Sequence, residues 1–309
     1  PHVVNILKNK KMKTEKELKD IVRDSYTKVA DQSKDYNIST CCGTTAVSDE
    51  NYSIMAEDYT KMDGYNEDAD LGLGCGLPTQ FAKISEGNTV IDLGSGAGND
   101  AFIARHEVGV SGKVLGIDFT PAMIAKARIN ADKRGFNNVE FREGDIDNMP
   151  VANNTADVVV SNCVLNLVPN KQKVMDDMFR VIKPGGHFSV SDIVLKGELP
   201  QALIDDSEMY AGCVSGAIQM DEYINAIEKA GFKNVEIQKE KIIQLPDDML
   251  LKYLNADQIE ELKERKTGIF SITVYGEKAS DAAPAKQKLN LKELQTSDEG
   301  ACCGPSGCC

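Results

Sequence analysis

The stretch VIDLGSGAGND, residues 90–100, decides the fold class. An apolar run is followed by Gly94, Gly96 and Gly98, and then by a segment of helix-forming composition that starts at Asn99. Glycines allow a tight turn between a strand and a helix, and they let a ligand approach the backbone closely. The free N–H groups of the first helical turn face the same ligand. The stretch therefore predicts a strand–loop–helix unit that binds a nucleotide-like cofactor.

The sequence after residue 88 alternates between strand and helix patterns. Strand patterns cover residues 89–94, 113–118, 138–145, 156–164 and 187–194; helix patterns cover residues 99–108, 120–135 and 171–182; and KPGG at 183–186 predicts a turn. Apolar runs that alternate with helices are typical of βαβ units, whose crossovers are right-handed. We therefore expect an α/β protein with a doubly wound, mostly parallel sheet.

The flanking segments predict a different organisation. Residues 12–32 read as an amphipathic helix, and after residue 195 helix patterns cover 199–216, 220–232 and 246–266, with strand patterns at 234–243 and 268–277. We divide the chain into an N-terminal helix with a cysteine-containing loop (1–70), a cofactor-binding domain (71–195), a smaller C-terminal α+β region (196–278) and a flexible cysteine-rich tail (279–309).

Charge and cysteine content narrow the functional class. The 309-residue chain has a formal net charge of −13, so its surface repels phosphate backbones and we expect no nucleic acid partner. No apolar stretch approaches the roughly 18–20 residues of a membrane span, and no secretory signal is visible. The nine cysteines could form an extracellular disulfide framework, but the cofactor-binding pattern favours ligand or redox roles in a reducing compartment. We expect a cytoplasmic monomer that does not bind membranes.

Two carboxylates follow the second and third predicted strands. Asp118 ends the second strand, where a carboxylate can accept hydrogen bonds from both hydroxyls of a ribose. Asp145 closes the third strand and suits the amino group of an adenine, with Phe119 and Ile146 as apolar walls. These positions predict an adenosine site beside the glycine loop.

The glycine spacing separates two cofactor classes. Dinucleotide-binding loops read G-x-G-x-x-G, whereas this loop reads G-S-G-A-G, and Asp92 before it suits a cationic methionine amino group. The stretches DLGSGAGN (92–99) and VIKPGGHFSVSD (181–192) resemble motifs of S-adenosylmethionine-dependent methyltransferases, which have a Rossmann-like fold. The resemblance implies S-adenosylmethionine as cofactor. The residues implied to contact it are Asp92, Gly94, Ser95, Gly96, Gly98, Asn99, Asp118, Phe119, Asp145, Ile146 and Asn162.

Three dispersed cysteines lie in or next to the predicted ligand edge. Cys163 ends the fourth strand, where it could be a small buried hydrophobe or a ligand. Cys75 in GLGCGLP and Cys213 in MYAGCVSG lie in small-residue loops, which packing explains less easily. Zinc sites normally show paired ligands with C-x₂₋₄-C spacing, which these three lack. A three-thiolate site of this kind is better matched to a trivalent, pyramidal metalloid.

The same stretches resemble the arsenite S-adenosylmethionine methyltransferases. GCGLP (74–78), DLGSGAGND (92–100), GIDFTPAMI (116–124), VVVSNCVLNLVPNK (158–171) and YAGCVSGA (210–217) carry the resemblance, which runs roughly from Cys41 to Phe232. It implies that Cys75, Cys163 and Cys213 bind arsenic(III), and that Cys42, or its neighbour Cys41, is a further catalytic cysteine. It also implies arsenite and methylated arsenicals as substrates, and thioredoxin or glutathione as reductant. Some members carry tyrosines where this chain has Gly72 and Leu73.

Two alternative functions stay open. The chain could methylate another small molecule and merely bury its cysteines, or it could sequester a soft metal on a degenerate methyltransferase fold. The intact glycine loop with Asp118 and Asp145 speaks against sequestration. The tail ACCGPSGCC (301–309) could capture soft metals or have no role in turnover.

Overall fold

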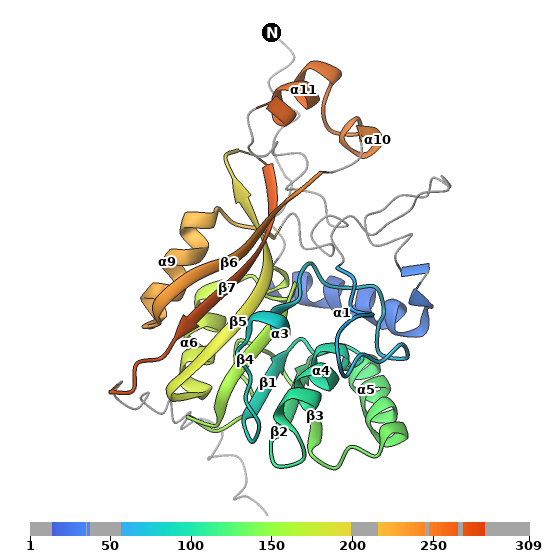
Figure 1. The fold of residues 1–309 in the computed structure, drawn as a ribbon. Helices are drawn as coiled ribbons and strands as arrows, with labels where there is room; N and C mark the ends of the chain where they lie inside the picture. The colour runs from blue at the N-terminus through green and yellow to red at the C-terminus, as the bar shows by residue number, and fades with distance from the viewer. Residues whose placement is uncertain are drawn as a thin grey trace, which may run out of the picture.

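A mixed sheet with the strand order β3-β2-β1-β4-β5-β7-β6 organises the molecule (Figure 1). The computed structural model describes residues 14–34, 36–37, 57–198, 216–244, 247–264 and 268–281. The strands are β1 (Thr89–Leu93), β2 (Lys113–Asp118), β3 (Val139–Glu143), β4 (Ala156–Asn162), β5 (Ile182–Lys196), β6 (Lys233–Ile243) and β7 (Gly268–Glu277). Strands β1 to β5 pair in parallel, whereas β7 is antiparallel to β5 and β6 is antiparallel to β7.

This sheet confirms the predicted fold class and corrects one detail. The turn predicted at KPGG is wrong, because residues 183–186 lie inside the continuous strand β5. The extra residues are absorbed as an irregularity in the register with β4: Ala156 pairs with Ile182, but Val158 pairs with His187. Gly185, with φ +82°, supplies the left-handed backbone that such a bulge requires.

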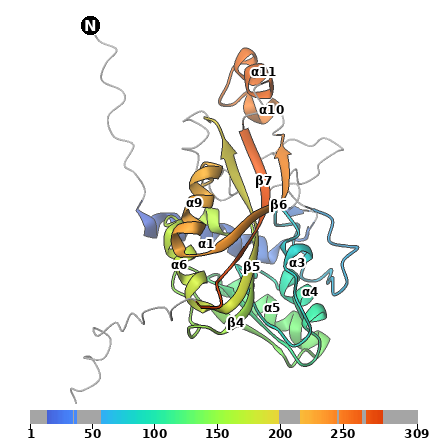
Figure 2. The same ribbon diagram turned by 60° about the vertical axis from the view of Figure 1, so that its left-hand side comes forward.

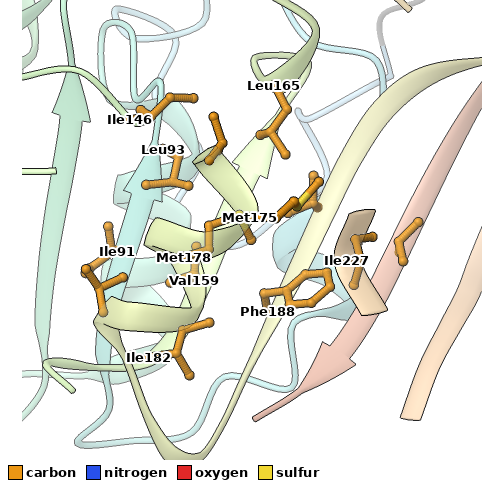
Figure 3. Packing of buried hydrophobic residues seen from close by; sticks show 14 of the residues in the cluster. Ile91, Leu93, Ile146, Val159, Leu165, Met175, Met178, Ile182, Phe188 and Ile227 are labelled. Atoms are coloured by element: carbon orange, nitrogen blue, oxygen red, sulfur yellow. The ribbon is translucent and has the colours of Figure 1, made fainter. Parts of the chain in front are cut away.

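Helices cover both faces of the sheet (Figure 2). They are α1 (Glu15–Asp31), α3 (Pro78–Phe81), α4 (Asn99–Val108), α5 (Pro121–Arg134), the 3₁₀ turn η1 (Leu165–Leu167), α6 (Lys171–Val181), α9 (Met220–Ala230), α10 (Asp247–Leu250) and α11 (Ala256–Glu264). Alternate residues of each strand face opposite sides. Ile91 of β1 therefore packs with Met175 and Met178 of α6 (Figure 3), whereas its neighbour Val90 belongs to the cluster that holds Phe102 of α4.

Several predicted helices are confirmed within a few residues. Helix α1 begins at a capping box, in which Thr14 Oγ1 accepts from the N–H of Glu17 and the Glu17 carboxylate accepts from the N–H of Thr14. The single helix predicted at 246–266 is instead two short helices, α10 and α11. Nearly all of the helix predicted at 199–216 lies outside the described residues.

Strands β6 and β7 come from the predicted C-terminal region, yet they extend the same sheet as the cofactor-binding strands. The division of the chain at residues 70, 195 and 278 stays a prediction, as does the monomeric state. No helix in the described part of the chain is long and apolar enough to cross a membrane.

Candidate active site

An open pocket with about 450 Å³ of empty space lies at the carboxyl ends of β1 and β4. Its wall includes several predicted cofactor residues, namely Asp92, Gly94, Ser95, Gly96, Asn99 and Asn162. In open α/β sheets, ligands bind outside the carboxyl ends of the strands. The pocket therefore lies where the sequence places the cofactor.

Backbone hydrogen bonds shape the glycine loop of this pocket. The N–H groups of Gly94 and Ser95 both donate to the carbonyl oxygen of Ile117, at 2.7 and 3.0 Å. Gly94 has φ +66°, and a Cβ there would lie only 2.3 Å from a methyl carbon of Val164. A side chain at this position would clash with its neighbour and strain the backbone, so the loop requires glycine here.

Three buried side-chain atoms in the pocket wall have no hydrogen-bond partner among the residues that the structure describes: Asp92 Oδ2, Ser95 Oγ and Asn99 Oδ1. Burial, together with the nearby carboxylates of Asp100 and Asp118, raises the pKa of Asp92 well above its ordinary value. The N–H of Ala101 donates to the Asp92 carboxylate, but Oδ2 stays unpaired. A buried carboxylate oxygen without a partner is costly, whereas an ammonium group would both neutralise the carboxylate and donate to that oxygen. The hydroxyl of Ser95 and the amide oxygen of Asn99 offer further polar contacts. These residues therefore fit the amino acid end of S-adenosylmethionine.

Asp118 holds the glycine loop from the end of β2. Its Oδ2 accepts from the N–H of Gly96 at 3.0 Å, and its Oδ1 accepts from the N–H of Thr120 at 2.8 Å. Burial raises the pKa of Asp118, although the two backbone hydrogen bonds act in the opposite direction. The predicted ribose contact stays a prediction, and the loop-holding contact is a role that the sequence did not indicate.

Replacing Asp118 by alanine should weaken the binding of S-adenosylhomocysteine about tenfold or more, because the variant loses a loop contact and the expected ribose acceptor. Isothermal titration calorimetry measures this affinity. Glu143→Ala is the matched control, since Glu143 is exposed and pairs in register with Asp118 on the next strand. Equal affinities in both variants would place the ribose site elsewhere.

The expected adenine site lies under helix α1. Ile146 is buried, and Phe119 is partly buried against the cluster that contains the two described cysteines. Asp145 lies 3.4 Å from Lys19 Nζ of α1. The amphipathic pattern of residues 12–32 is compatible with either a capping helix or a substrate lid, and it does not indicate the contact with Asp145.

Cys75 and Cys163 lie on either side of Asn162. The N–H of Cys75 donates to Asn162 Oδ1 at 3.0 Å, its Sγ is 3.9 Å from the same oxygen, and Cys163 follows Asn162 in the chain. Both cysteines belong to one cluster of buried residues, and neither forms a disulfide with another described residue. The structure thus brings two of the three predicted arsenic ligands into one part of the fold.

The remaining predicted thiols, Cys42, its alternative Cys41, and Cys213, lie outside the described residues, as does the cysteine-rich tail. Among the residues that the structure describes, no group of three or more His, Cys, Asp or Glu side chains is arranged to hold a metal ion. That search includes only two of the three predicted ligands. The three-thiolate site therefore stays a prediction.

The turn that carries Cys163 has an unusual backbone conformation, and hydrogen bonds to β5 hold it in place. Cys163 has φ +59°, which is uncommon for a residue other than glycine, and its N–H donates to the carbonyl oxygen of Ser191 at 2.8 Å. Asn166 in the same turn donates to Asp192 Oδ1 at 2.8 Å. Asp192 is fully buried, which raises its pKa to about 7. Such strained, over-determined positions cluster at functional sites.

Tyr59 and Asp100 are among the pocket residues that the sequence did not indicate. Tyr59 Oη lies 2.9 Å from Asp100 Oδ2, and Asn162 Nδ2 lies 3.3 Å from the same oxygen and also donates to Tyr59 Oη. Burial raises the pKa of Asp100 to about 6. Asp100 directly follows the glycine motif, which could have indicated it. Tyr59 lies in no motif, and it lines the pocket together with Leu73.

Comparisons with known proteins agree with this geometry. A family model described as a methyltransferase domain matches residues 84–231. An arsenite methyltransferase from Halobacterium salinarum is 43% identical over 234 residues, which cover 72% of this chain and 59% of the relative. The chain thus spans less than two thirds of that relative's length. An arsenite methyltransferase from Aquipseudomonas alcaligenes is 31% identical over 240 residues, covering 75% of this chain and 67% of the relative.

A solved structure is similar as well. An arsenic(III) S-adenosylmethionine methyltransferase from Chlamydomonas reinhardtii superposes with a TM-score of 0.57 at 31% identity, and the match covers 68% of this chain and 69% of that chain. The similarity therefore extends from the sequence motifs to the arrangement of the strands and helices.

Proposed function

The chain belongs to the arsenite methyltransferase family, and we propose that it transfers a methyl group from S-adenosylmethionine to thiolate-bound trivalent arsenic, giving methylated arsenicals. The observation that carries this proposal is the position of Asn162. It lines the cofactor pocket, accepts from the N–H of Cys75 and precedes Cys163 in the chain. Through this one residue, two of the thiols that we propose to bind arsenic lie beside the pocket that we propose to hold the cofactor.

The pocket residues would hold the amino acid end of the cofactor, and carboxylates at the end of β2 and after β3 would hold its ribose and adenine. Asp92 would accept from the ammonium group, and the N–H groups of the glycine loop would face the carboxylate of the amino acid end. Asp118 would accept from the ribose hydroxyls, and Asp145 would accept from the adenine amino group. When bound, S-adenosylmethionine supplies a methyl group activated by a positively charged sulfur. The buried walls of the pocket would exclude water from that methyl group.

The thiolates of Cys75, Cys163 and Cys213 would orient the arsenic. Trivalent arsenic bound to three sulfurs is pyramidal and keeps its lone pair on the side away from them. Holding the ligands rigidly aims that lone pair, and positioning of this kind supplies several kcal/mol of a barrier, roughly 7–11 at the extreme. The lone pair carries no proton, so the mechanism needs no general base.

Methylation oxidises the arsenic by two electrons, and thiols of the chain would return it to the trivalent state. Closing a disulfide between Cys42 and Cys75 would supply those two electrons. A cytoplasmic thiol reductant such as thioredoxin or glutathione would then reopen the disulfide by exchange.

The test is release of S-adenosylhomocysteine by the purified chain, with arsenic speciation, in the presence of a thiol reductant. We expect release that depends on arsenite and methylated arsenicals among the products. Cofactor and arsenite binding without turnover would instead support soft-metal sequestration. Turnover that ignores arsenite but responds to another small molecule would support a different methyl acceptor.

A further inference from the structure

Lys19 of helix α1 lies among three carboxylates at the expected adenine site, one of which is Glu15 of the same helix, whose Oε1 is 3.6 Å from Lys19 Nζ. Its Nζ is 3.1 Å from Asp147 Oδ2 and 3.4 Å from Asp145 Oδ1, both in the segment after β3. The Lys19 side chain is 19% exposed, whereas the exposed fractions of Asp145 and Asp147 are 44% and 8%. The lysine is therefore the more enclosed partner of Asp145, and it fixes a carboxylate that otherwise faces water.

Helix α1 reaches the site through two further contacts. The Arg23 guanidinium lies 5.3 Å from the centroid of the Phe119 ring, a cation–π distance. Val22, one residue earlier, is 1% exposed and packs in the cluster that contains Cys75 and Cys163. Figure 1 shows α1 lying above α4 and α5, so these contacts join the helix to the edge of the sheet at which the pocket opens. The helix thus forms an outer wall of the expected adenine site.

We propose that Lys19 is a positioning residue for base recognition: it holds Asp145 in the orientation that accepts from the 6-amino group of adenine. The inference rests on the proposed function, because it assumes that the adenine of S-adenosylmethionine lies at Asp145. The reason is electrostatic. Asp145 and Asp147 carry like charges that share one cation, so without Lys19 their repulsion turns the more exposed Asp145 toward solvent.

Lys19 keeps its charge in this position. Burial alone lowers the pKa of Lys19, but the hydrogen bond to Asp147 and the negative charges of Asp145 and Asp147 outweigh that effect and raise it. The ammonium group has three donors, so it can hold Asp147 while Asp145 accepts an additional hydrogen bond from the base.

The experiment compares two ligands that differ at one group. S-adenosylhomocysteine carries the 6-amino donor, whereas S-inosylhomocysteine carries an oxygen acceptor there. Calorimetry gives the ratio of their dissociation constants in the full-length chain and in Lys19→Met, Lys19→Arg and Lys28→Met. Lys28 is an exposed lysine on the same helix and controls for the loss of one positive charge.

We expect the wild-type chain to prefer the adenine ligand, and Lys19→Met to reduce that preference about tenfold, the weight of one charge-assisted hydrogen bond. Lys19→Arg and Lys28→Met should keep the wild-type preference. If Lys19→Met weakens both ligands equally, or changes neither, α1 is only a structural cover and the inference is wrong. A wild-type chain without any preference would overturn the adenine assignment at Asp145 as well. The proposed arsenite methylation is tested separately, by arsenite-dependent release of S-adenosylhomocysteine.

Discussion

Replacing Cys163 by serine should abolish arsenite-dependent methyl transfer, with a loss of at least about 1,000-fold in rate, while the affinity for S-adenosylhomocysteine stays nearly unchanged. A hydroxyl is a poor ligand for a soft atom such as arsenic. The remaining thiolates could still capture arsenite, but they would no longer fix the direction of its lone pair, and that positioning supplies several kcal/mol. The pocket residues with unpaired polar atoms are untouched by this change.

The measurements are arsenite-dependent release of S-adenosylhomocysteine and calorimetric binding of the same product. Because Cys163 is buried at φ +59°, its replacement could also destabilise the fold, so thermal unfolding is followed in parallel. Cys163→Ala separates the two effects, since alanine has neither a thiol nor a buried hydroxyl to satisfy. A folded serine or alanine variant that methylates arsenite at the wild-type rate would show that Cys163 is a packing residue.

The sequence predicts the parallel half of the sheet well because β1, β2 and β4 are mostly buried apolar runs. Strands β1 and β2 lie within the residues expected for them, and the glycine loop is found between β1 and α4 as its pattern requires. The inclusion of KPGG (183–186) in β5 could not be predicted from the turn preferences of these residues. The conformation of these residues depends on the chain just after β7, because the N–H of Gly185 donates to the carbonyl oxygen of Lys278, nearly a hundred residues later.

In the candidate site, too, the positions set by local sequence patterns could be predicted, whereas the contacts between distant residues could not. Their positions at the carboxyl ends of strands predict that Cys163 and Asp118 lie at the edge of the sheet where ligands bind, because these ends share one edge in a parallel sheet. The contact between Lys19 and Asp147 joins residues 128 positions apart, and helical periodicity indicates only which face of α1 is buried, not what it contacts. Tyr59 meets Asp100 across 41 positions, and neither residue's surroundings in the sequence indicate that contact.

Replacing Asp92 by asparagine should weaken the binding of S-adenosylhomocysteine by about 10- to 100-fold, the weight of a hydrogen bond between charged partners. Asparagine keeps the shape of the side chain but loses the negative charge that the ligand's ammonium group would neutralise. The affinity for 5′-methylthioadenosine, which lacks the whole amino acid end, should not change. Asp176→Asn, an exposed carboxylate on α6, controls for the loss of one charge.

The same substitution should not destabilise the ligand-free protein at neutral pH. Burial raises the folded-state pKa of Asp92 well above its value in the unfolded chain, which is about 3.9. As pH rises above about 4, the unfolded state therefore loses this proton first, and the free energy of unfolding of the ligand-free protein falls until the folded-state pKa is passed. Asparagine has no such proton, so Asp92→Asn should reduce this decline in urea unfolding measured from pH 5 to 8. A variant that binds the cofactor product normally and unfolds with the wild-type pH dependence would show that Asp92 is neither the ammonium site nor a buried carboxyl group with a raised pKa.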